Sequence, residues 1–329
     1  RRDFTINAMA YNDKEGLLDL FGGIDDLNKK VIRCVGNPEE RFTEDALRIM
    51  RAVRFAGQLG FSIEEKTKQA ASKLSGNLEK ISAERIETEI RKLLLSNHPE
   101  LLRTAYELGI TEVVLPEFDA IMQTEQNTPH HFTNVGELIP ANKVLRYTML
   151  LHDMGKPKMK TTDENGRDHF KGHGEESERI ANEVLHRLKM DNDTIKKVTK
   201  LVKWHDVRTQ PTPKAVRKAM NKLGEELYPL LLQVQYADTM AQSTYQREEK
   251  LERIHKVKVI YEQIIEEKQC FSIRNLAVNG KDLIAIGVTQ GKQIGEILNI
   301  LLEDVLEEPS HNTKEYLLEL AKNKIGQEA

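Results

Sequence analysis

Long stretches rich in Ala, Glu, Lys, Leu and Arg run through most of this chain and restrict what it can fold into. Charged residues make up 31% of the 329 residues and aromatic residues only 5%. Chains of this composition are mostly helical. We expect helices from near Thr43 to about Leu115, then, from Arg247 onward, one long charged helix, an Asn279-Gly280 turn and two more helices. The length predicts two or three domains.

The ten opening residues, RRDFTINAMA, alternate between apolar and polar side chains. This alternation predicts a short strand with one polar face, and an ordinary basic strand end would have the same pattern. The polar side chains offer two guanidinium groups, a carboxylate and an amide, which are suited to binding a triphosphate and a ribose. They belong to Arg1, Arg2, Asp3 and Asn7. The sequence of residues 12–16 then predicts a hairpin turn. Gly22-Gly23 indicates the start of a helix.

The string EDALR at 44–48 is the second signal. On one helix, Glu44 and Asp45 would share a face with Arg48, which also describes a common surface ion pair. A carboxylate and a guanidinium side by side can, however, select bases. Cytosine and adenine present an amino donor beside a ring-nitrogen acceptor, whereas uracil and guanine present a carbonyl and an N–H. One such fork could therefore choose C and A without a nucleic-acid template.

RRDFTINAMA followed by EDALR resembles the motifs of class II tRNA nucleotidyltransferases, the CCA-adding enzymes and their poly(A) polymerase relatives. The resemblance implies an elongated enzyme that adds C and/or A to the tRNA 3′ end from CTP and ATP, with Mg²⁺ as cofactor and pyrophosphate as product. Poly(A) synthesis, or addition of only CC or only A, stays open. The nucleotide-binding residues it implies are Arg1, Arg2, Asp3, Asn7, Glu44, Asp45 and Arg48, to which we add Arg51 and Arg54, whose side chains could equally be solvated.

The resemblance also places paired catalytic aspartates upstream of Arg1. The one D-x-D string, at 191–193, follows a Lys-rich run and predicts a turn that connects helices. No pair of carboxylates adjoins the opening motif, so we expect the chain as printed to add no nucleotide.

Histidines and aspartates form a separate pattern between the two helical parts. His152-Asp153, His173, His205 and Asp238 follow the order of metal ligands in HD-superfamily phosphohydrolases, which this segment resembles. Such ligands suit Mn, Fe, Ni, Zn or Mg. The resemblance makes His152, Asp153 and Asp238 the primary ligands and gives His173 and His205 to a second ion. The histidine that opens such sites is missing near residues 134–137, so we expect a weak or empty site.

These patterns predict four segments. Residues 1–40 are the remnant of a nucleotidyltransferase head with a little β structure, 41–120 a helical neck, 121–246 an inserted HD-like domain, and 247–329 a helical tail in which Lys281 could contact RNA. The rival function is an HD metal phosphohydrolase whose flanks only bind RNA. Two unpaired cysteines and the absence of an apolar run of roughly 20 residues favour a cytoplasmic protein without a membrane span. The sequence leaves the oligomeric state open.

Overall fold

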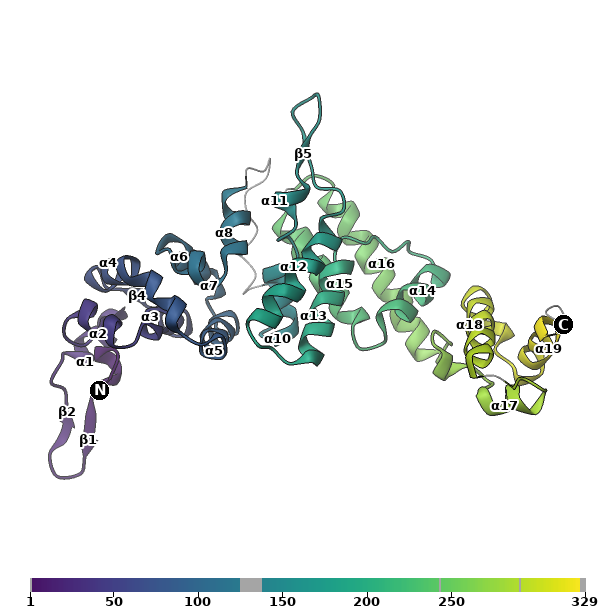
Figure 1. Cartoon of the computed structure of the whole chain (residues 1–329), viewed down its shortest axis with the longest axis horizontal. Coiled ribbons are helices and arrows are strands. Elements are labelled where there is room, and N and C mark those ends of the chain that lie inside the picture. The colour runs from purple at the N-terminus through teal and green to yellow at the C-terminus, as the bar shows by residue number, and fades with distance from the viewer. Residues whose placement is uncertain (1, 125–137, 243, 290, 326–329) are drawn as a thin grey trace. The chain divides into compact units, whose positions relative to one another are not determined.

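A computed structural model describes residues 2–124, 138–242, 244–289 and 291–325, and helices dominate it (Figure 1). Most of the described chain belongs to two compact units, residues 1–206 with 237–243, and residues 207–236 with 244–329. This arrangement confirms the predicted helical fold class. In the part described, no helix is both long enough and apolar enough to cross a membrane.

The first unit contains the helices α1 Gly23–Lys29, α2 Pro38–Glu44, α3 Leu47–Leu59, α4 Glu65–Leu74, α5 Ala83–Leu94, α6 Leu102–Glu107, α7 Ile110–Val114, α8 Pro116–Gln123, α10 Lys143–Leu151, α11 Lys156–Met159, α12 His173–Arg187 and α13 Asn192–Trp204. Helix α15 (Tyr228–Ala241) has residues in both units. The second unit contains α14 Pro213–Leu223, α16 Arg247–Glu266, α17 Gly280–Ala285, α18 Gly291–Glu307 and α19 Lys314–Ile325.

Short strands pair two by two. The pairs are β1 (Ala10–Asn12) with β2 (Gly16–Leu18), β3 (Val31–Ile32) with β4 (Ser62–Ile63), and β5 (Thr161–Thr162) with β6 (Asp168–His169). The first and third pairs are antiparallel and the second is parallel. Ala10 lies opposite Leu18, which confirms the hairpin turn expected at residues 12–16.

The expected opening strand is wrong. Thr5–Asn7 form a short 3-10 helix, and Phe4 keeps only a single bridge to Cys34. Local side-chain bonds explain the difference, because Asn7 Oδ1 accepts from the Phe4 N–H at 3.2 Å and Thr5 Oγ1 donates to the buried Asp26 carboxylate at 2.7 Å. Bonds of this kind compete with an extended backbone.

The helix expected from Thr43 through Arg48 is interrupted. Helix α2 begins one residue after its cap Asn37 and ends at Glu44, where Asp45 is extended with φ −151°. Asp45 Oδ1 then accepts from the Leu47 N–H at 3.2 Å and so caps α3. Glu44 and Arg48 consequently lie on different helices.

A buried ion pair joins α3 to α5. Arg54 Nε lies 2.6 Å from Glu89 Oε2, and both side chains are less than a tenth exposed. Helix α10 also contacts α5. The buried Arg146 on α10 donates to the Leu94 carbonyl at the end of α5 at 3.0 Å. This contact holds α10, which ends immediately before His152, against the end of α5.

Helix α13 confirms the interpretation of the D-x-D string. Asp191 is the N-cap of α13, and its side chain accepts from the Thr194 N–H at 2.8 Å. Lys143 at the start of α10 pairs with the other Asp191 oxygen at 2.7 Å. Asp191 is therefore a structural cap between packed helices.

The second unit is organised by a buried guanidinium. Arg217 on α14 donates through Nε to the Leu306 carbonyl at 3.0 Å, and through Nη2 to the Glu307 carbonyl at 3.3 Å, which caps α18.

The structure confirms the long charged helix that was expected from Arg247 onward, as α16. Among the residues that the structure describes, three α-helices follow it instead of two, because Asn279 is the N-cap of the additional short helix α17.

Breaking the ion pair between Arg54 and Glu89 should be costly. Glu89→Ala leaves the Arg54 guanidinium buried and unpaired, which typically costs about 3–5 kcal/mol. Urea unfolding followed by circular dichroism measures this loss. The double variant Arg54→Met/Glu89→Leu should recover most of it, and Glu107→Ala, which removes the exposed pair with Arg103, should change little. Equal effects of Glu89→Ala and Glu107→Ala would contradict the expectation.

Candidate functional site

The opening motif and helix α3 meet at one carboxylate. Asp3 Oδ1 lies 3.0 Å from Arg48 Nε, and Asp3 Oδ2 lies 2.6 Å from Arg51 Nη2. The Asp3 and Arg48 side chains are 13% and 12% exposed, so the pair is largely shielded from water. The structure thus brings the two sequence motifs together through Asp3, Arg48 and Arg51.

Arg48 is held by three acceptors. Besides Asp3, its Nη1 donates to Glu44 Oε2 and to the Arg41 carbonyl, both at 2.8 Å. These bonds use three of the five guanidinium N–H donors. Within the described parts of the chain, the two donors on Nη2 have no partner. The hydrogen bond from Arg48 also holds the pKa of Glu44 below its ordinary value.

Asp45 does not pair with the Arg48 side chain. Its Oδ2 lies 2.9 Å from Arg85 Nη2 on α5, and its Oδ1 caps α3. The carboxylate remains about one-third exposed. Base reading by an Asp45/Arg48 fork would therefore require Asp45 to exchange Arg85 for the base.

Sequence reasoning missed Arg41. Its Nη1 pairs with Glu44 Oε2 at 2.9 Å, and its Nη2 donates to the Arg2 carbonyl at 2.9 Å. Arg41 thus links the end of α2 to the opening motif. The signal that could have found it is the spacing of three residues between Arg41 and Glu44 on one helix.

The other predicted residues have different surroundings. Arg2 is exposed, Asn7 bonds the Phe4 N–H, and Arg54 is buried against Glu89. Lys281 is exposed, and its backbone N–H bonds the cap Asn279 at 2.9 Å. Arg1 lies outside the described residues.

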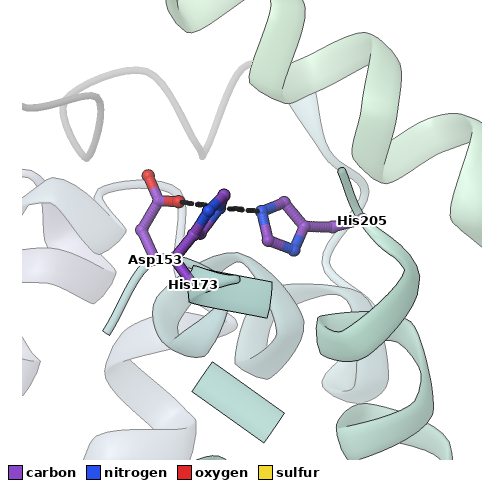
Figure 2. A group of neighbouring side chains, drawn as sticks. All are labelled: Asp153, His173 and His205. Atoms are coloured by element: carbon purple, nitrogen blue, oxygen red, sulfur yellow. Dashed lines mark hydrogen bonds and ion pairs between the residues drawn. The ribbon is translucent and has the colours of Figure 1, made fainter. Parts of the chain in front are cut away.

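The predicted metal ligands come together from four helices. His152 and Asp153 directly follow α10, His173 begins α12, His205 directly follows α13 and Asp238 lies on α15. Their ligand atoms form two groups with all atoms within 4.8 Å of one another: Asp153, His173 and His205, and His152, Asp153 and Asp238. Figure 2 shows the first group, with both imidazoles and the carboxylate pointing toward one another.

All three imidazoles are oriented by backbone carbonyls. The Nδ1 atoms of His152, His173 and His205 lie 2.8, 2.8 and 2.6 Å from the carbonyls of Met149, Phe170 and Val202. A carbonyl only accepts, so each Nδ1 carries the proton and each Nε2 faces the cluster. Metal-binding histidines are typically fixed in this way.

Burial shapes the charge of the cluster. His152 Nε2 and Asp238 Oδ1 are buried without a hydrogen-bond partner in the described structure, although they lie 3.5 Å apart. Burial lowers the pKa of His152, but the carboxylates of Asp153 and Asp238 outweigh it and raise that pKa to about 9. Burial lowers the pKa of His173, which therefore stays a neutral imidazole near pH 7.

The donor set fits a divalent ion of borderline hardness. Imidazole and carboxylate are ligands of Zn, Ni, Co, Mn and Fe, and the two groups supply two imidazoles with one carboxylate and one imidazole with two carboxylates. Residues 134–137, where the opening histidine was sought, lie outside the described part of the chain.

Comparison with known proteins identifies the family. A CCA-adding enzyme of Enterococcus faecalis is 30% identical over 323 residues, which cover 98% of this chain and 70% of the relative. An A-adding tRNA nucleotidyltransferase of Deinococcus radiodurans is 31% identical over 324 residues, covering 92% of this chain and 73% of the relative. The chain belongs to the class II tRNA nucleotidyltransferases.

Family models and solved structures agree with this membership. Residues 1–33 match the poly(A) polymerase head domain, residues 60–122 the probable RNA- and SrmB-binding site of polymerase A, and residues 174–321 domain 2 of tRNA nucleotidyltransferases. The CCA-adding enzyme of Bacillus stearothermophilus in complex with CTP has a similar fold, with a TM-score of 0.71 at 24% identity over 99% of this chain and 73% of that chain.

Close packing behind the cluster is testable at Gly155. A Cβ there would lie 2.5 Å from the His173 carbonyl oxygen and 2.7 Å from the Ser177 nitrogen. Gly155→Ala must therefore push the segment after Asp153 away from α12, and such overpacking costs about 1–3 kcal/mol. Thermal unfolding should show a lower melting temperature. Gly76→Ala, where nothing lies within 4 Å of the new Cβ, is the control, and equal melting temperatures for the two variants would refute this account.

Proposed function

We propose that this protein adds C and/or A to the 3′ end of tRNA from CTP and ATP and releases pyrophosphate. The observation that carries the proposal is the fixed guanidinium of Arg48, which joins the two family motifs and still offers two N–H donors. The named activities of the Enterococcus and Deinococcus relatives agree with it. Because one relative is CCA-adding and the other A-adding, the set of nucleotides added is left open, and poly(A) synthesis remains the alternative.

Each residue of the proposed nucleotide site has a role set by its surroundings. Arg48 donates from Nη2 to the base ring nitrogen, and Asp45 accepts from the amino group after leaving Arg85. Asp3 positions the guanidiniums of Arg48 and Arg51. The remaining proposed contacts are Arg1, Arg2 and Asn7 with the triphosphate and ribose, and Lys281 with the RNA. We leave Arg54 out, because it is buried against Glu89.

The proposed reaction is an in-line nucleotidyl transfer. The tRNA 3′-hydroxyl oxygen forms a bond to the α-phosphorus, and the bond from that phosphorus to the bridging oxygen breaks as pyrophosphate leaves. Mg²⁺ would supply the positive charge that such transfer needs. The residues of this chain bind and orient the nucleotide, which by itself lowers the barrier. The segments 1–40, 41–120, 121–246 and 247–329 remain our proposed domains, and we infer a cytoplasmic location.

Substitutions in the two motifs should have different effects. Arg48→Ala and Asp45→Ala should lower the preference for CTP over UTP roughly ten- to a hundred-fold, because each removes a charge-assisted bond to the base. Arg2→Ala should weaken CTP and ATP use alike, because phosphates carry no base identity. Incorporation into tRNA lacking its 3′ end, by the natural protein and each variant, measures this. An unchanged ratio for Arg48→Ala would leave Arg48 as an ion-pair residue only, and the exposed Arg103→Ala is the control.

A second function is favoured by the histidine cluster. We propose that it binds a transition-metal ion and hydrolyses a small phosphoester, such as a 2′,3′-cyclic phosphate. An ion bound there would supply Lewis acidity to water and to the phosphoester. Asp153 belongs to both ligand groups and is the central ligand. Lys156, whose Nζ lies 2.5 Å from Asp153 Oδ2, is close enough to hold a phosphate oxygen.

Asp153→Ala should abolish both metal binding and phosphoester hydrolysis, because it removes the ligand shared by the two groups. The ratio of CTP to UTP incorporation should not change. Metal analysis of purified protein and hydrolysis of a cyclic phosphate measure the first two effects. Asp193→Ala on the exposed face of α13 is the control. Stoichiometric metal in Asp153→Ala would overturn the assignment, as would a protein that binds no metal at all.

A further inference from the structure

The two oxygens of Asp153 face different partners. Oδ1 lies 3.5 Å from His173 Nε2 and 3.7 Å from His205 Nε2. Oδ2 lies 3.4 Å from His152 Nε2 and 2.5 Å from Lys156 Nζ. Oδ1 therefore faces two imidazoles, whereas Oδ2 already contacts the positive charge of the Lys156 ammonium.

We propose that the cluster binds a single divalent ion through Asp153, His173 and His205, and that the Lys156 ammonium takes the place of a second ion beside His152 and Asp238. This inference rests on the proposed metal function and decides which residues carry it. It differs from the expectation drawn from the sequence, in which His152, Asp153 and Asp238 are the primary ligands.

The geometry of the His173 side fits one ion. His173 Nε2, His205 Nε2 and Asp153 Oδ1 form a triangle. The two nitrogens lie 3.0 Å apart, and Asp153 Oδ1 lies 3.5 Å from His173 Nε2 and 3.7 Å from His205 Nε2. Ligands about 2.05 Å from a tetrahedral ion are about 3.3 Å apart, within this range. Since both Nδ1 atoms donate to carbonyls, two Nε2 lone pairs face each other at 3.0 Å. A cation between them removes that repulsion.

Distances alone do not exclude an ion on the other side, because His152 Nε2 lies 3.4 Å from Asp153 Oδ2 and 3.5 Å from Asp238 Oδ1. The positive charge of Lys156 disfavours a second ion on this side. The Lys156 ammonium is only 11% exposed and contacts the same Asp153 oxygen that a second ion would need. Its repulsion of a divalent ion is strong where water is largely excluded. The other Asp238 oxygen is taken by Gln242 Nε2 at 2.7 Å.

Counting metal ions tests the proposal directly. The whole chain is stripped with a chelator, loaded with Zn²⁺ or Co²⁺, and analysed by mass spectrometry for metal per chain and by titration for affinity. We expect one ion per chain. His205→Ala and His173→Ala should weaken binding by roughly a hundredfold, because each removes a direct ligand. Asp238→Asn should keep one ion, and Lys156→Met should bind two.

The control is His186→Ala, an exposed histidine on α12 whose Nδ1 also bonds a backbone carbonyl. The visible spectrum of the Co²⁺-loaded wild-type protein reports the coordination geometry of the ion, and this measurement does not depend on the folding of a histidine variant. Two ions in the wild-type protein, one ion in Lys156→Met, or loss of the ion in Asp238→Asn would each overturn the proposal. A wild-type protein that binds no ion would instead overturn the metal function on which it rests.

Discussion

The ion pair between Asp3 and Arg48 is the interaction on which the proposed nucleotide site depends. It joins residues 45 positions apart and is largely shielded from water, so each partner needs the other. Arg51 shares the carboxylate, and Glu44 and the Arg41 carbonyl complete the shell around Arg48. The result is a guanidinium that cannot rotate freely and keeps two donors for a ligand, which is the preorganisation that recognition of a base requires.

A second buried carboxylate organises the histidine cluster in the same way. Asp153 lies where α10, α12 and α13 pack together. Its Oδ1 faces the imidazoles of His173 and His205, and its Oδ2 contacts the ammonium of Lys156. Both centres therefore follow one physical rule. A carboxylate removed from water selects the cations around it, and the packing of helices decides which ones can reach it.

Where the sequence-based interpretation failed, short-range polar bonds were the cause. Alternation predicted a strand through Phe4 and Asn7, but the side chains of Thr5 and Asn7 bond nearby groups and wind the segment into a 3-10 turn. The helix expected through residues 43–48 breaks because Asp45 caps the next helix with its own side chain. Periodicity does not register either effect, because a single capping bond outweighs a weak local preference.

The sequence by itself determined the family motifs, the helical fold class, the β1–β2 hairpin, the structural role of the turn at residue 191 and the residue types of both centres. These follow from composition, turn chemistry and the order of chemically distinctive residues. Only the tertiary structure decided that Arg54 is buried, that Asp45 pairs with Arg85, and that Lys156 covers one oxygen of Asp153. Each of these depends on burial and on the direction of a side chain, and packing between helices sets both.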